Sequence, residues 1–337
     1  MHSLPSLVAG ILFAGLATVA RAAPDDAPPA TRFSGTVFLD ITHLDQSRHG
    51  ARTDASGTDG DIKRFQLSLD HTFDDIWSVD LTTDANYSRT GEHHFYWKKA
   101  YLQGAFSKLA TLRAGSASLP WIPFVEDWYG YRFVEPTLID RARFGTSADW
   151  GLHLLGDNGV FDYQASIVNG GGYKHPARGD GADFEGRVGF QPIRNVVIAI
   201  GGYSGELGAH ATPALHDAHR EDAMMAYNAN GFRLGGEYFR ASDWNNVTTP
   251  ASDSADGWSL WSSYDFGRAS IFARYDHVRP SRQLDAGLKD IYYNFGVAFP
   301  VTRGVRVAVA YKNERLTNDT TTDTRTRELG AWGELKF

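Results

Sequence analysis

The chain has 337 residues, no cysteine and a formal net charge of −7. The missing cysteines exclude a disulfide framework and a thiolate metal site, and the acidic balance argues against nucleic acid as a partner. Glycine (35 residues) and aromatic residues (13%) are abundant, whereas there are only 3 methionines.

The N-terminal segment has the features of a signal peptide. An apolar stretch over 7–19 precedes Ala-Arg-Ala at 20–22, which has the small-residue pattern of a signal-peptidase site. A membrane anchor is the alternative, but the stretch is short for a spanning helix. We therefore predict a signal peptide over 1–22, a short linker over 23–31 and the folded domain over 32–337. For an exported chain of this length, the composition favours an all-β fold.

Short segments of the folded domain alternate between apolar and polar residues. Val305, Val307 and Val309 share one face of such a segment, and Arg306 lies on the other. A period of two is typical of β-strands whose two faces meet different environments. The pattern predicts strands near residues 33–41, 64–73, 76–86, 97–106, 109–115, 146–155, 159–168, 182–190, 195–203, 223–229, 231–241, 256–266, 268–276, 289–299, 304–312 and 326–337.

The connections between these strands alternate between short and long. Short ones, such as "GDNG" at 156–159, carry the residues that tight turns require. Long polar loops, such as residues 42–62 and 207–222, lie between them. Short turns on one side, long loops on the other and an even strand number are the features of a membrane barrel. We predict a transmembrane antiparallel β-barrel of about sixteen strands, closed so that no sheet edge meets lipid.

Aromatic residues near the strand ends support this fold, because membrane barrels carry aromatic girdles at both interfaces. The alternative is a soluble two-sheet sandwich, in which the same rings would pack in the core. The last strand ends on Phe337, which shares its apolar face with Leu329 and Leu335. The rings predicted to lie on the outer face are Trp77, Trp97, Trp150, Tyr238, Trp258, Tyr264, Tyr275 and Tyr311.

An apolar-alternating last strand with a C-terminal Phe337 resembles Gram-negative outer-membrane proteins, and sixteen strands with eight long loops resemble the general porins. Residues 98–156 look like the phosphate-selective porin O and P family, in "AYLQG" at 100–104, "RAG" at 113–115 and "SADWG" at 147–151. The resemblance implies a location in the outer membrane, a lumen that passes small hydrophilic solutes or ions, and a lipid bilayer as partner. It also implies that the barrel-assembly machinery recognises the last strand, with Phe337 as part of the assembly signal. It leaves a homotrimer open.

The third long connection, residues 116–145, differs from the other loops in composition. It is rich in aromatic residues and proline, with Trp121, Phe124 and Trp128 among them, rather than in Ser, Thr and Asp. In the porins that the chain resembles, the loop at this place folds inward and narrows the channel. We expect the same here; an ordered external cap or a subunit contact is the alternative.

Charged side chains that line a narrow aqueous pore set its ion preference. On the inward loop we predict the constriction residues Glu126, Asp127, Arg132, Glu135, Asp140, Arg141 and Arg143. On the barrel wall we predict the pore-lining residues Arg64, Lys99, Arg113, Arg187 and Arg233. Glu126 and Asp127 are expected to approach the wall that carries Arg64, Lys99 and Arg113. For each of these residues, a solvated lumen charge or a wall ion pair is the alternative.

Two short motifs suggest enzyme or metal chemistry, and neither is complete. "GYSGE" at 202–206 lacks the last glycine of G-x-S-x-G and ends a strand instead of opening a helix. "HDAHRED" places His216, Asp217, His219 and Asp222 close together in the sequence. An external loop supplies neither the fixed geometry nor the supporting shell that a metal site needs. We therefore predict no metal, no cofactor and no enzymatic activity.

The leading interpretation is a passive outer-membrane diffusion channel for small hydrophilic solutes or ions. The first alternative is a solute-selective channel, either for anions such as phosphate or for sugars that stack on Trp128 and Tyr131. The second alternative is an outer-membrane barrel enzyme, for which the sequence offers no convergent set of His, Ser and Asp residues.

Overall fold

The computed structural model of the chain describes residues 30–86, 94–176, 181–209, 214–318 and 320–337. The predicted signal peptide over 1–22 lies outside the described residues, as does the predicted linker over 23–31 except for its last two residues. Those two residues already belong to the first strand, which begins at Ala30.

Sixteen long strands form the wall, and a seventeenth, β2 (Ala51–Arg52), extends the tip of the first hairpin. The long strands are β1 (Ala30–Arg48), β3 (Gly57–Thr72), β4 (Trp77–Asn86), β5 (His94–Ser107), β6 (Ala110–Ser118), β7 (Ala148–Asp157), β8 (Phe161–Val168), β9 (Asp183–Phe190), β10 (Val196–Gly205), β11 (Ala218–Ala229), β12 (Phe232–Ser242), β13 (Ser254–Asp265), β14 (Ser270–Arg279), β15 (Lys289–Thr302), β16 (Val305–Thr317) and β17 (Asp323–Lys336).

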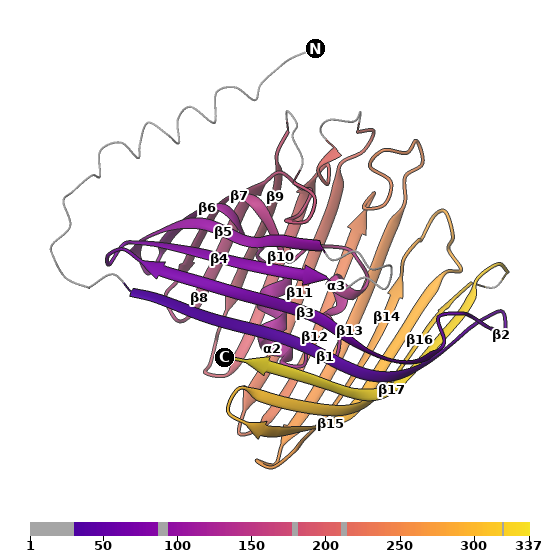
Figure 1. Ribbon diagram of the computed structural model, residues 1–337. Coiled ribbons are helices and arrows are strands. Elements are labelled where there is room, and N and C mark those ends of the chain that lie inside the picture. The colour runs from indigo at the N-terminus through magenta and orange to yellow at the C-terminus, as the bar shows by residue number, and fades with distance from the viewer. Residues whose placement is uncertain (1–29, 87–93, 177–180, 210–213, 319) are drawn as a thin grey trace.

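These strands close into one antiparallel barrel (Figure 1). Each long strand pairs with the next along the chain, and β1 pairs with β17 from Thr36↔Lys336 to Arg48↔Thr324. Closure leaves no unpaired edge in the wall, which is what a strand assembly in lipid requires. The predicted closed sixteen-strand barrel is confirmed, and each predicted strand overlaps an observed one. The largest differences are in the first hairpin, where β1 ends at Arg48 rather than near residue 41 and β3 begins at Gly57 rather than near residue 64.

The outer face of the barrel is apolar. Along β17, Leu329 is exposed on the outside while Trp332 is buried on the inside, as the alternation predicts. The terminal Phe337 has 71% of its surface exposed, and its ring covers Gly35 on β1, where a Cβ would lie only 2.3 Å from the ring. Backbone hydrogen bonds between Gly35 and Phe337 in both directions hold the chain end at the barrel seam.

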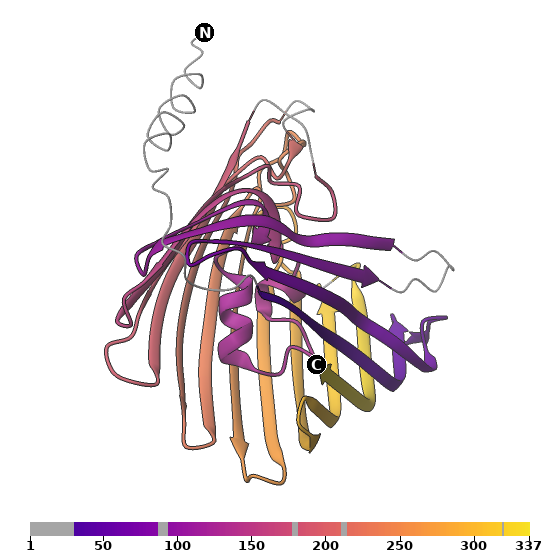
Figure 2. The same cartoon turned by 60° about the vertical axis from the view of Figure 1, so that its left-hand side comes forward.

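The connection between β6 and β7 lies inside the barrel and contains both described helices, α2 (Ile122–Tyr129) and α3 (Leu138–Arg141), as Figure 2 shows. Its apolar residues form one buried core with the inward faces of β10 to β17. The wall makes room with small inward residues, namely Ala199, Ala226, Ala241, Ala298, Ala308 and Ala310. Neither helix is long and apolar enough to cross a membrane.

Candidate solute path in the barrel lumen

Helix α2 forms because its apolar residues fall on one helical face and its ends carry suitable residues. Ile122, Val125 and Tyr129 have the i, i+3, i+7 spacing of one face, and all three are buried against the wall. A proline in the first turn suits a helix start, and Gly130, with a φ of 77°, ends the helix in the left-handed conformation that glycine tolerates. The aromatic composition of the segment is therefore explained by burial inside the barrel.

Two wall arginines bind the C-terminal end of α2. Arg233 donates to the carbonyls of Asp127 and Trp128 at 3.2 Å each, and Arg306 donates to the carbonyl of Gly130 at 2.9 Å. The last carbonyls of a helix lack partners within it and carry a partial negative charge, so cations there are stabilising. Arg233, predicted as a pore-lining charge, thus fastens the segment to the wall.

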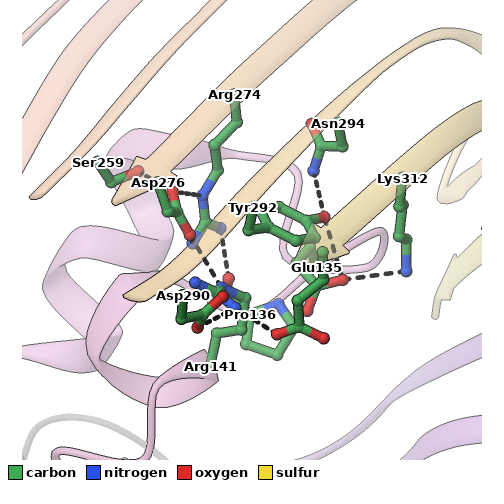
Figure 3. A network of polar contacts seen from close by, with 11 residues as sticks. Glu135, Pro136, Arg141, Ser259, Arg274, Asp276, Asp290, Tyr292, Asn294 and Lys312 are labelled. Carbon is green, nitrogen blue, oxygen red and sulfur yellow. Dashed lines mark hydrogen bonds and ion pairs between the residues drawn. The ribbon is translucent and has the colours of Figure 1, made fainter. Parts of the chain in front are cut away.

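A buried polar network fastens α3 to strands β14 to β16 on the same side of the barrel (Figure 3). Arg141 binds Asp276 at 2.9 Å, Asp290 at 2.9 Å and Glu314 at 2.7 Å. The guanidinium of Arg274, on the same strand, donates to both carboxylate oxygens of Asp276. Arg141, predicted as a constriction charge, is therefore an anchor between three carboxylates.

Glu135 completes this attachment. Its carboxylate lies 3.1 Å from Lys312, which also binds Glu328 at 3.2 Å, and it accepts a hydrogen bond from Tyr292. Burial alone would raise the pKa of Glu135, but Lys312 and Arg141 outweigh that effect and hold the pKa below its usual value. The glutamate therefore stays charged and paired.

Arg132, Glu126 and Asp140 form a separate cluster on the side of the segment that faces β3 to β5. Arg132 donates to Glu126 at 2.6 Å and to Asp140 at 2.9 Å. Burial would raise the pKa of Glu126, but Arg132, Lys98 and Arg64 together hold it below the usual range. Lys98 and Arg64 are thus wall cations that act on Glu126.

A β-bulge in the facing wall changes which lysines point inward. The register between β4 and β5 shifts between Thr82 and Thr83, so that Lys98 has no partner of its own and Lys99 pairs with Thr82. Trp97 stays on the outer face, while Lys98 is buried and Lys99 binds Asp80 at 3.1 Å. Both lysines therefore belong to the lumen. A strict alternation of inward and outward residues does not predict that Lys98 faces the lumen.

The expectation that both Glu126 and Asp127 face Arg64, Lys99 and Arg113 is half wrong. Consecutive helical residues point about 100° apart. Asp127 is accordingly exposed, with Arg233 and Lys336 as its cationic neighbours. On the wall, Lys99 forms its ion pair with Asp80, as described above.

Three further predicted residues lie elsewhere. Arg113 donates to Gln103 at 2.8 Å and lies over the ring of Tyr101. Arg187 pairs with Asp162, donates to the carbonyl of Pro120 and covers the ring of Phe124 at 3.7 Å. Arg143 is exposed and forms no ion pair with any described residue. The predicted set is therefore dispersed through the lumen rather than gathered in one ring.

The rings considered for sugar stacking are not free. Tyr131 is buried and stacks on Phe272 with 4.4 Å between ring centroids. Trp128 packs against the same apolar core. The stacking hypothesis for this pair is therefore not supported by their positions.

The residues of the histidine-rich motif do not converge. Arg220 points inward and binds Asp222 at 2.9 Å and Glu185 at 3.1 Å, whereas His219 points outward. Within the described residues, no group of three His, Cys, Asp or Glu residues could hold a metal ion. Arg220 instead donates to the carbonyl of Phe144 and so holds the end of the inward segment.

The loop after β8 also reaches the lumen, which the sequence did not indicate. Tyr173 is buried and donates to Asp84 on β4 at 2.5 Å. Lys174 lies over the rings of Tyr96 and Tyr173, at 5.4 and 5.6 Å. A lone "YK" pair in a glycine-rich loop carries no periodic signal, so only the fold reveals its position.

The fold is shared with solved outer-membrane proteins. OmpT of Vibrio cholerae, in a trimer form, has 13% identity and a TM-score of 0.61, with 92% of this chain and 100% of that chain covered. The anion-selective porin from Comamonas acidovorans has 10% identity and a TM-score of 0.62, with coverage of 92% and 100%. OmpF of Salmonella typhi, in complex with daunomycin, has 11% identity and a TM-score of 0.62, with coverage of 91% and 97%. At these identities the likeness shows the fold alone.

Among curated proteins, no sequence is significantly similar to this chain. The sequence model of the family described as Gram-negative porin, in contrast, matches residues 6–331. This match spans nearly the whole chain but does not single out the phosphate-selective porin O and P family within it. The chain belongs to the Gram-negative porin family and is a diffusion channel of the outer membrane.

Proposed function

We propose that solutes pass between the inward segment 116–145 and the wall formed by β3, β4 and β5. The observation that carries this proposal is the burial of the opposite wall: Arg274, Asp276 and Lys312 are covered by the segment and paired. Groups that are buried and paired offer nothing to a passing solute. The cluster of Arg132, Glu126 and Asp140 then forms the loop side of the constriction.

We propose that this constriction favours small anions over cations of similar size. The facing wall carries Arg64 and Lys98, and neither forms an ion pair with a described residue. Glu126 and Asp140 are both already bound by Arg132. With Lys174 and Asp84 included, four cations (Arg64, Lys98, Arg132 and Lys174) lie with three carboxylates (Asp84, Glu126 and Asp140) at the narrow part. The excess charge is therefore positive, and a positive field in a narrow pore attracts anions.

The test is a reversal-potential measurement in planar bilayers with a gradient of potassium chloride. The expected potential has the sign of chloride permeation and becomes smaller in variants that lose one cation of the facing wall, such as Lys98→Gln. A potential with the sign of potassium permeation would contradict the proposed preference while leaving the channel itself established.

Four further points belong to the same proposal. The protein is a channel and not an enzyme, which the porin family and the barrel fold support. The lipid bilayer covers the apolar outer face, and the barrel-assembly machinery recognises the last strand.

The protein assembles as a homotrimer, which the trimer form of Vibrio cholerae OmpT supports by shared fold. Light scattering of the detergent-solubilised protein tests the trimer; a monomeric mass would contradict it.

A further inference from the structure

A cavity of about 350 Å³ lies beside the Arg132 cluster, towards the long-loop end of the barrel. Its lining comes from the wall, from the inward segment and from the loop after β8. The residues used below are Arg64, Asp84, Arg132, Asp140, Tyr173 and Lys174. The cavity is at the lower end of the volumes of about 300–1,000 Å³ that hold small organic ligands.

The loop after β8 is built into this cavity and does not merely pass over it. Gly170 donates to Asp149 at 3.0 Å, and the backbone of Tyr173 donates to the carbonyl of Ala148 at 3.0 Å. The hydroxyl of Tyr173 then reaches across to Asp84, while its ring meets the edge of Tyr96 at 6.3 Å. Residues 169–174 are thus held at both ends of the span that roofs the cavity.

Two lysines lie near the Tyr173 ring. Lys98 lies 5.9 Å and Lys174 lies 5.6 Å from its centre. Lys98 has only 6% of its surface exposed, and its ammonium group forms no hydrogen bond or ion pair with a described residue. Lys98 is not one of the residues that line the cavity, but its buried ammonium group adds positive charge beside the Tyr173 ring, and this charge favours an anion nearby.

Other cations around the cavity add to the positive charge of Lys98. Arg64 and Lys174 also lack an ion pair within the described residues. Of the two carboxylates in the lining, Asp84 is bound by Tyr173 and Gln66, and Asp140 is bound by Arg132. Hydrogen bonds from neutral groups do not neutralise Asp84. Even so, the lining has four cations, Lys63, Arg64, Arg132 and Lys174, against two carboxylates, Asp84 and Asp140, and therefore carries a net positive charge.

We propose that this cavity is a binding subsite for small organic carboxylates, held by Lys174 and Arg64 under the roof formed by Tyr173, with Lys98 adding positive charge beside that ring. The cations bind the carboxylate, and the ring of Tyr173 contacts its carbon body. The volume suits a compact organic acid better than a bare inorganic ion. This inference rests on the proposed anion preference and adds the class of anion and a loop that helps to choose it.

The test measures how succinate reduces the chloride current through single channels in planar bilayers. For the unaltered channel we expect block at a defined half-blocking concentration. Lys98→Gln and Lys174→Gln should each raise that concentration several-fold, because each removes one charge from the subsite. Tyr173→Phe should raise it as well, because the roof loses its bond to Asp84.

Lys108→Gln is the matched control, since Lys108 is exposed in the short turn between β5 and β6. It removes the same charge far from the cavity and should leave the half-blocking concentration unchanged. Lys174 lies outside the strands, so its variant remains informative even if Lys98→Gln fails to fold.

An unchanged half-blocking concentration in Lys174→Gln would overturn the subsite. Equal block by inorganic phosphate, lost in the same variants, would overturn the assignment to carboxylates. If the unaltered channel conducts but prefers potassium, the proposed function fails. If it prefers chloride and the variants behave like Lys108→Gln, only the present inference fails.

Discussion

At the scale of single residues, most charges of the lumen serve to hold the inward segment in place. Arg141, Glu135 and Arg233 were predicted from alternation and loop composition as charges that solutes meet. Each instead binds a group across the segment–wall boundary. Sequence reasoning placed them on the correct face but could not pair them, because Arg141 and Asp276 are separated by 135 residues.

Arg141→Met tests the anchoring role. The change leaves Asp276, Asp290 and Glu314 without their shared cation, and removing one partner of a buried ion pair costs about 3–5 kcal/mol. We expect a lower free energy of unfolding for the refolded protein in detergent, measured by tryptophan fluorescence during denaturant titration. Arg143→Met is the control on the same segment, because Arg143 is exposed. Equal stability of the two variants would refute the anchor.

Glu126→Gln tests the charge balance at the constriction. It removes an acid that interacts with Lys98 and Arg64, so the chloride-to-potassium permeability ratio should rise. Asp127→Asn removes the same charge from the next residue, which points towards Arg233 and Lys336 instead. Its effect on the permeability ratio should be clearly smaller. A larger effect for Asp127→Asn would show that the path runs on the other side of α2.

At the scale of elements, the strands could be predicted from the sequence and the inward segment only in part. Strand residues alternate locally, so the period of two places them within a few residues. The bulge that turns Lys98 inward has no such signal. The helices were missed because α2 has a hydrophobic face that meets the barrel wall, and its aromatic content indicates burial without indicating a helix.

Excision of residues 121–133 tests the role of the inward segment. This stretch holds α2, whose buried face covers the wall, and it takes part in no strand pairing. Replacing it with a short Gly-Ser linker should raise the single-channel conductance roughly twofold or more, since the lumen widens. Heat-modifiable electrophoretic mobility checks that the barrel still closes. Unchanged conductance in a closed barrel would place the segment outside the conducting path.

Deletion of Phe337 tests the last strand as an assembly signal. Its ring covers Gly35, and its loss from lipid should cost only about 2 kcal/mol. We expect less folded barrel in cells, while protein refolded in detergent keeps nearly the same stability. Phe299→Ala, which removes an exposed ring from β15, serves as the control for loss of outer apolar surface. An equal cellular yield of the deletion and the parent protein would argue against the signal.

At the scale of the whole molecule, the barrel is filled unevenly. The segment 116–145 packs on β10 to β17, where the wall offers small residues and buried partners, and leaves the β3 to β5 side to solutes. The closed barrel, the outer-membrane location and the channel function could be predicted from strand number, loop lengths and the terminal strand. The side of the lumen that stays open could not be predicted, because it depends on side-chain pairs between distant strands.

The central claim is that solutes pass along the β3 to β5 wall and not along the covered wall. Because the natural chain has no cysteine, one introduced cysteine is a unique target. Gln66→Cys lies on the proposed path beside Asp84, whereas Ser259→Cys lies behind the segment, bound to Asp276 with 1% of its surface exposed.

The decisive measurement is the single-channel current before and after a charged methanethiosulfonate reagent is added to each variant. We expect the current to fall in Gln66→Cys and to stay unchanged in Ser259→Cys. A current that falls in Ser259→Cys while Gln66→Cys is unaffected would contradict the account.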